Sequence, residues 1–182
     1  DDPEFVAMFL DEAKMAANLR HPNVVPTLDV VDDASGLFIV MEYVDGVSLQ
    51  WLLRSFRDKD RRIPAPVALR IGLDLLAGLQ AAHELHAADG TPMRLVHRDV
   101  SPQNVLVGAA GIAKIMDFGI ARAETRIITT RGGQIKGKIQ YMSPEQLAGL
   151  AVDHRSDVYA AGIVLWEMLT GRGLFRADND AA

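Results

Sequence analysis

The chain has 182 residues, of which 49% are hydrophobic and 24% charged, and its formal net charge at neutral pH is -5. This balance is typical of one globular domain and does not indicate disorder. The negative charge argues against general nucleic-acid binding, which needs a basic excess. The lack of cysteine excludes disulfides, thiolate nucleophiles and cysteine-ligated metals. We find no signal-peptide pattern and no run of about 18 apolar residues, so we expect no membrane contact within this segment.

The first part of the chain predicts one helix followed by a strand hairpin. Asp2-Pro3 is a helix start, because the aspartate caps free amides and the proline presets the first helical φ. We expect this helix to end near Arg20. Apolar runs at 24–31 and 37–41 flank the turn sequence of residues 32–36, which predicts an antiparallel hairpin.

The rest of the chain predicts two long helices and two short strands. Strands are expected at 105–107 and 112–116. Residues 156–170 are apolar nearly all round, which predicts a buried central helix that Gly171 terminates. Residues 66–86 predict an amphipathic helix with one buried stripe, made of Val67, Ile71, Leu75, Leu79 and Ala82.

The strongest local signal is a polar loop. Residues 97–104 are His-Arg-Asp-Val-Ser-Pro-Gln-Asn, and Asp117-Phe118-Gly119 begins thirteen residues after Asn104. The acid Asp99, the amide Asn104 and the acid Asp117 can together offer oxygen ligands to a hard cation. Magnesium bound this way takes its other ligands from water and substrate phosphates, so the pattern indicates phosphoryl-transfer chemistry.

These residues resemble, in order, the catalytic-loop and magnesium-loop motifs of protein kinases. Residues 143–145, Ser-Pro-Glu, resemble the family's Ala-Pro-Glu motif, and residues 153–159 resemble the start of its central helix. Upstream, residues 19–25 resemble the segment between the regulatory helix and the next strand, and residues 39–46 resemble the hinge. The chain is therefore similar to eukaryotic-like protein kinase catalytic domains of the bacterial serine/threonine type.

The resemblance implies an α+β, two-lobe fold cut at both ends. It divides the single domain into a small-lobe remnant at 1–42, a hinge at 43–46 and most of the large lobe at 47–182. The family's glycine loop and its phosphate-binding lysine are expected before the first residue, so the isolated segment is expected to be inactive. The catalytic domain is expected to be cytoplasmic, and an anchor outside this segment is left open.

The resemblance also assigns roles in catalysis. Asp99 would accept or orient the proton of the substrate hydroxyl, and Asn104 and Asp117 would hold Mg²⁺, with Mn²⁺ as an alternative. The expected cosubstrate is ATP, and the expected partners are protein substrates.

An adenine site is implied at the hinge. The backbone of Glu42 and Val44 would hydrogen-bond the base, with Met41 behind it as gatekeeper and Leu106 below. Glu12 would pair with the phosphate-binding lysine.

Two positions depart from the usual serine/threonine pattern. Ser101 stands where the catalytic loop normally has lysine, and Lys138 stands where the activation segment normally has threonine. We hypothesise that they have exchanged roles, with Lys138 reaching the transferring phosphate and Ser101 supplying the hydroxyl. Unchanged turnover of a Lys138→Ala variant would contradict this hypothesis. Alternatively, Lys138 is a solvated lysine and Ser101 a neutral substitution.

Regulation is indicated by Arg98, which precedes the catalytic aspartate. In the family such an arginine often holds a phosphorylated activation-segment residue, because a guanidinium fits a phosphate. We predict phosphorylation at Thr129 or Thr130, with a dimer for autophosphorylation left open. Alternatively, this is simply an exposed basic loop.

The histidines favour structural interpretations. In the family, His97 packs against Phe118 and does not act as a base. His83 and His86 lie three apart, a spacing that permits metal binding, but a structural role is favoured. Asp157 is either a helix cap or, as the family suggests, also a group that holds the catalytic-loop backbone.

Three functions compete. An active ATP-dependent serine/threonine protein kinase is favoured, because Asp99, Asn104 and Asp117 are all present. Ser101 and Lys138 suggest a pseudokinase or signalling scaffold. A small-molecule kinase of the aminoglycoside type shares the loop acid and amide but is not expected to show residues 143–145.

Overall fold

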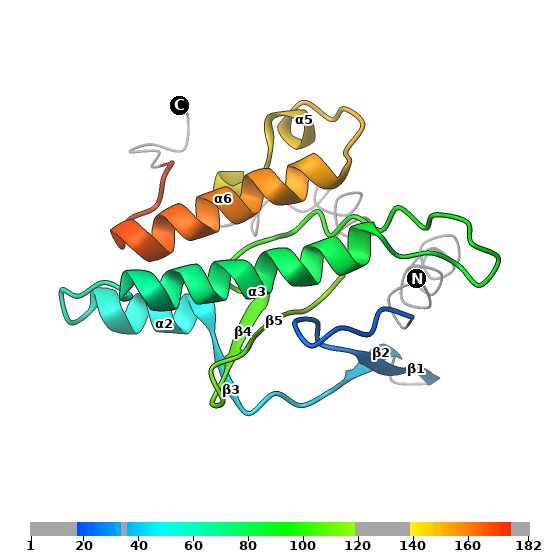
Figure 1. Cartoon of the computed structure of the whole chain (residues 1–182), viewed down its shortest axis with the longest axis horizontal. Helices are drawn as coiled ribbons and strands as arrows, with labels where there is room; N and C mark the ends of the chain where they lie inside the picture. The colour runs from blue at the N-terminus through cyan, green and yellow to red at the C-terminus, as the bar shows by residue number, and fades with distance from the viewer. Residues whose placement is uncertain (1–17, 34–35, 119–138, 176–182) are drawn as a thin grey trace.

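The computed structural model describes residues 18–33, 36–118 and 139–175, and these form an α+β fold with a strand-rich part and a helical part (Figure 1). The expected α+β class is confirmed. The elements, in chain order, are β1 (Thr27–Asp33), β2 (Gly36–Met41), β3 (Gly46–Ser48), α2 (Leu49–Arg57), α3 (Ala65–His83), β4 (Val105–Gly108), β5 (Ala113–Ile115), the 3-10 helix η2 (Ile139–Tyr141), α5 (Pro144–Leu147) and α6 (His154–Thr170).

The predicted hairpin is confirmed as the antiparallel pair β1 and β2. Thr27 lies opposite Met41, and the pairing continues to Asp33 opposite Gly36. Both strands therefore extend into the predicted turn. Gly36 permits this, because its φ of 134° lies in a region that other residues rarely adopt.

A second sheet, with strand order β3-β4-β5, joins the hinge region to the helical part. β4 and β5 confirm the two predicted strands, whereas β3 was not predicted. It lies so close to β4 that a Cβ atom on Gly46 would be 2.3 Å from the carbonyl oxygen of Val107. Glycine at this position therefore lets the chain that leaves the hinge pair with the sheet.

Helices α3 and α6 run antiparallel and side by side through the helical part (Figure 1). Leu165 of α6 packs close to Gly72 of α3. The predicted stripe on α3 is buried at four of its five positions, but Val67 is 47% exposed and Ala68 is buried in its place. The stripe begins one residue later than predicted, at Ala68, because residues 64–67 at the start of α3 are exposed.

Helix α6 ends as predicted, since Gly171 adopts a left-handed φ of 69° and caps the last turn. Its N-cap is Asp153, whose carboxylate accepts a hydrogen bond from the Arg155 amide. Hydrogen bonds from Arg155 lower the pKa of Asp153 to about 2, so this cap stays ionised at neutral pH.

The predicted burial on all sides is wrong for the described residues, where Val158 and Trp166 are about half exposed. Burial depends on which elements cover a face, and apolar composition alone does not supply them.

Helix α3 also corrects the expectation about membrane-length segments. Its 19 residues, with a mean hydropathy of 1.3 over the best window, are by length and composition sufficient to cross a membrane. Among the described helices no other meets this test. In the structure α3 packs against α6 and β5 and buries Ile71, Leu75 and Leu79, whereas Leu69, Leu73 and Leu76 are exposed.

Helix α2 was missed by the sequence analysis. Ser48 caps it by accepting a hydrogen bond from the Trp51 amide, and Leu49 and Leu53 are buried. The signal was present, because a serine cap precedes apolar residues at helical spacing. The backbone amide of Gln50 donates to the carbonyl of Pro102, which ties α2 to the loop at 97–104.

Candidate active site

The loop at 97–104 is held by a buried carboxylate. Asp157, which is 1% exposed on α6, accepts hydrogen bonds from the backbone amides of His97 (2.9 Å) and Arg98 (2.8 Å). Its Oδ2 also lies 2.7 Å from Nε2 of His83 on α3. The predicted role of Asp157 in holding the loop is confirmed, and Asp153 is the residue that caps the helix. Asp157 therefore joins both long helices to the loop.

His97 is a structural residue, as predicted. Its ring is fully buried and lies 4.7 Å from the Phe118 ring, centroid to centroid. Its Nδ1 accepts a hydrogen bond from the Asp99 amide, and its Nε2 lies 2.9 Å from the carbonyl oxygen of Met116. These partners require a neutral ring that donates through Nε2, which excludes His97 as a base in this arrangement.

Asp99 and Asn104 form one hydrogen-bonded unit. The side-chain amide of Asn104 donates to the carbonyl oxygen of Asp99 at 2.8 Å and to its Oδ2 at 2.9 Å. Both amide hydrogens are thereby used, and the backbone amide of Asn104 closes a turn on the carbonyl of Ser101. Within the described ranges the side-chain oxygen of Asn104 accepts no hydrogen bond, so it is available as a ligand.

Asp117 follows the strand that lies beside this loop. The backbone amide of Met116 donates to the carbonyl of Asn104 at 2.9 Å, which brings the two expected metal ligands onto neighbouring segments. Asp117 and Arg98 have φ values of 65° and 67°. Left-handed backbone at residues other than glycine costs roughly 1–3 kcal/mol each and clusters at functional sites.

The donor set fits magnesium. One carboxylate and one amide oxygen are hard ligands, and Mg²⁺ normally completes its shell with water and substrate phosphates. No group of three or more histidine, aspartate or glutamate side chains suited to a metal occurs in the described part of the chain. His83, for which metal binding was considered, instead contacts Asp157, and Nδ1 of His86 lies 2.6 Å from the carbonyl of Glu84.

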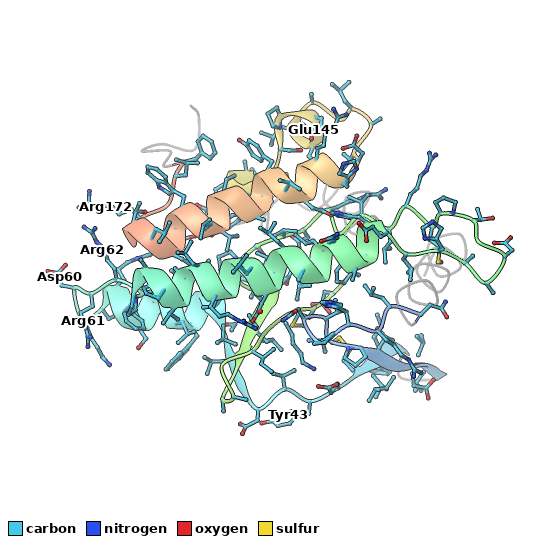
Figure 2. All side chains as sticks on the ribbon, in the orientation of Figure 1. Tyr43, Asp60, Arg61, Arg62, Glu145 and Arg172 are labelled. Carbon is cyan, nitrogen blue, oxygen red and sulfur yellow. The ribbon has the colours of Figure 1, made fainter. Side chains whose placement is uncertain are left out.

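The hinge limits which backbone groups of the expected adenine site can bind a ligand. The backbone amide of Glu42 donates to the carbonyl of Pro26 at 3.1 Å, so only its carbonyl is left for a ligand. Its side chain pairs with Lys114 on β5 at 2.7 Å. Met41, Val44 and Leu106 are half-buried, as residues lining a pocket would be. Tyr43, which is 86% exposed, projects from the link between β2 and β3 (Figure 2).

Residues 143–145 dock against the loop through a neighbour that the sequence analysis missed. The side-chain amide of Gln146 donates to the carbonyl of Arg98 at 2.7 Å. Ser143 and Gln146 form a capping box at the start of α5. The hydroxyl of Ser156 donates to Glu145, which lowers the pKa of that carboxyl. A serine followed three residues later by glutamine is the recognisable signal of such a box.

The remaining predicted site residues are only partly described. Ser101 is 2% exposed, and its hydroxyl has no hydrogen-bond partner among the residues that the structure places. Glu12, Thr129, Thr130 and Lys138 lie outside the described residues. The proposed exchange between Ser101 and Lys138 therefore stays a prediction.

A strand-rich part joined by a hinge to a helical part, with an acid and amide loop clamped from the central helix, defines a protein kinase fold. The chain belongs to the protein kinase domain family, whose model matches residues 2–182. It is similar to the kinase domain of Mycobacterium tuberculosis PknI, with a TM-score of 0.73 and 28% identity over 96% of this chain and 60% of that one.

Curated relatives agree with this family. The chain is 43% identical to "Tyrosine-protein kinase MasK" of Myxococcus xanthus, and the match covers all of this chain and 28% of that protein. It is 39% identical to "Serine/threonine-protein kinase PknB" of Mycobacterium leprae over 98% of its length and 28% of that protein. The chain thus spans between a quarter and a third of the length of these two relatives.

Proposed function

We propose that the whole protein transfers the terminal phosphoryl group of ATP to serine or threonine hydroxyls of protein substrates. The observation that carries this proposal is the Asp99–Asn104 unit on a loop whose backbone Asp157 clamps. Phosphoryl transfer depends mostly on positioning and electrostatic stabilisation, and this clamp provides positioning. The names of several relatives as serine/threonine kinases support the same function.

The roles of the residues follow from their surroundings. Asp99 would accept the proton of the attacking hydroxyl, while Asn104 holds its carboxylate in place. The side-chain oxygen of Asn104 and the carboxylate of Asp117 would hold Mg²⁺ against the phosphates of ATP. When bound, that ion neutralises charge on the phosphates and orients them. Leu106, Met41 and Val44 would enclose the adenine, with the carbonyl of Glu42 as one acceptor.

A second candidate acceptor is tyrosine. It is favoured by the 43% identity to a protein named as a tyrosine kinase. Against it, Pro102, three residues after Asp99, resembles the serine/threonine type, because tyrosine kinases usually differ at this position. The two acceptors are distinguished by the chemistry of the product alone.

The test is phosphoamino-acid analysis of the full-length protein incubated with labelled ATP, Mg²⁺ and a general protein substrate. We expect phosphoserine and phosphothreonine, and mass spectrometry of the enzyme should find phosphate at Thr129 or Thr130. An Asp117→Asn variant is the control, because it removes one magnesium ligand and should abolish both products.

Each other outcome has a definite meaning. Phosphotyrosine as the sole product would refute the hydroxyl assignment but retain phosphoryl transfer. Nucleotide binding without any transfer, in a protein that is folded, would favour the pseudokinase alternative. Phosphate elsewhere between residues 118 and 143, but at neither threonine, would contradict the predicted regulatory site.

A further inference from the structure

One face of α2 borders a polar pocket next to the catalytic loop. Gln50, Leu53, Arg54 and Arg57 follow the helical spacing that places side chains on one face, and all four line the pocket. The pocket has a volume of about 150 Å³. Its other walls come from the catalytic-loop turn, η2 and α6, through Pro102, Gln140, Tyr141 and Glu167.

The pocket lies beside the expected site of phosphoryl transfer. Pro102, in its wall, belongs to the same turn as Asn104 and follows Asp99 by three residues. The hydrogen bond from the Gln50 amide to the Pro102 carbonyl fixes α2 against this turn. A peptide that presents a hydroxyl to Asp99 would therefore extend past α2.

The only carboxylate in the pocket wall, Glu167, is already neutralised. Its Oε1 accepts a hydrogen bond from Arg57 at 3.1 Å, and its Oε2 accepts one from the Tyr141 hydroxyl at 2.6 Å. Glu167 is 8% exposed, so its carboxylate is largely shielded from water, whereas the Arg57 side chain is half exposed. Burial and the neighbouring Glu167 raise the pKa of Tyr141 well above its usual range, so its hydroxyl stays a donor.

Arg54 is the unpaired positive charge in this pocket. Among the described residues its side chain makes no hydrogen bond or ion pair, whereas Arg57 keeps one guanidinium nitrogen on Glu167. A guanidinium presents several donors suited to a carboxylate or phosphate. With Glu167 satisfied, the pocket has spare donors and a net attraction for an anion.

The surrounding surface has the same sign of charge. Figure 2 shows Asp60, Arg61, Arg62 and Arg172 together at one end of the molecule, where α2 and α6 terminate. Among the described residues, and with the pocket residues included, this end carries six basic and three acidic side chains, a local charge of +3. The nine are Arg54, Arg57, Lys59, Arg61, Arg62 and Arg172, with Asp58, Asp60 and Glu167.

We propose that the pocket formed by Gln50, Arg54, Arg57, Pro102, Tyr141 and Glu167 binds an acidic side chain of the peptide substrate, and that Arg54 determines this specificity. This inference rests on the proposed function and adds a substrate class to it. The acidic group would pair with the guanidinium of Arg54, while Tyr141 and Arg57 keep Glu167 from repelling it.

The test is a set of serine peptides in which each position near the acceptor is in turn Asp, Lys or Ala, phosphorylated by the full-length protein. At one position we expect Asp to raise kcat/KM about fivefold or more over Ala, the size of a partly exposed charge-assisted contact. An Arg54→Glu variant should reverse the preference at that position and favour Lys. Arg155→Glu is the matched control, because it reverses a charge on the surface of α6 outside the pocket and should leave the preference unchanged.

A binding experiment separates the pocket inference from the proposed function. It uses the same peptides with the acceptor serine replaced by alanine, and fluorescence anisotropy measures their binding. Turnover of the serine peptides without any acid preference, or an acid preference that survives Arg54→Glu, would overturn the inference and leave the proposed function intact. Acid-dependent binding that Arg54→Glu reverses, without turnover of any peptide, would support the pocket and refute phosphoryl transfer.

Discussion

Replacing Asp99 with asparagine is expected to lower kcat of the full-length protein by about 10²–10⁴-fold, the usual contribution of a general base. The substitution preserves shape, and the new amide oxygen can still accept the hydrogen bond from Asn104. The loop should therefore keep its conformation and lose only the group that takes the proton. We expect the melting temperature and the KM for ATP to change little, which steady-state kinetics and thermal denaturation would measure together.

Asp89→Asn is the matched control for that experiment. Asp89 is an exposed aspartate that accepts a hydrogen bond from the Thr91 backbone, which lowers its pKa. The same chemical change there removes a charge without touching the catalytic loop, so kcat should be unchanged. A kcat for Asp99→Asn within about threefold of the wild type would fall outside the range of a lost base and contradict the role of Asp99.

Replacing Asp157 with alanine is expected to have the largest effect on stability, because one buried carboxylate serves the backbone of two loop residues and a side chain of α3. The variant would leave the amides of His97 and Arg98 without an acceptor, in a region where Asp157 is 1% exposed. Breaking a buried charged network typically costs about 3–5 kcal/mol of unfolding free energy. Chemical denaturation of the full-length protein would measure this loss, and kcat should fall at the same time.

An Asp157→Asn variant keeps the experiment informative if the alanine variant does not fold. Asparagine retains one acceptor but places an amide donor against a backbone N–H, so we expect an intermediate loss of stability. Asp153→Ala, at the cap of the same helix, is the control, because that carboxylate is on the surface and should matter less. Equal stability of the Asp153 and Asp157 variants would contradict the clamp.

The clamp also explains how a short loop can hold its unusual backbone. Arg98 adopts a positive φ of 67°, and its amide and carbonyl are both engaged, by Asp157 and by Gln146. The position of Asp99 is thereby determined by residues that lie 48 and 59 positions beyond Arg98 in the chain. Disturbing α5 or α6 should therefore disturb the catalytic loop.

Several features followed from the sequence because their causes lie within a few residues. The hairpin between β1 and β2 follows from apolar runs around a turn, and the end of α6 follows from the left-handed conformation that glycine permits at Gly171. The loop from His97 to Asn104 closes through a local turn and local side-chain contacts, so its motif could be recognised. Local spacing and capping do not depend on the rest of the fold.

Other features were decided only by tertiary structure. His83 and Asp157 are 74 residues apart, and Arg57 and Glu167 are 110 apart, so no local pattern links them. The use of the Glu42 amide by Pro26 and the exposure of Trp166 likewise depend on neighbouring elements. The sequence by itself determined the catalytic motif, the order of most elements and the family. Packing decided how the catalytic loop is held and where the polar pocket beside α2 forms. Both depend on contacts between distant residues, which exist only once the elements have come together.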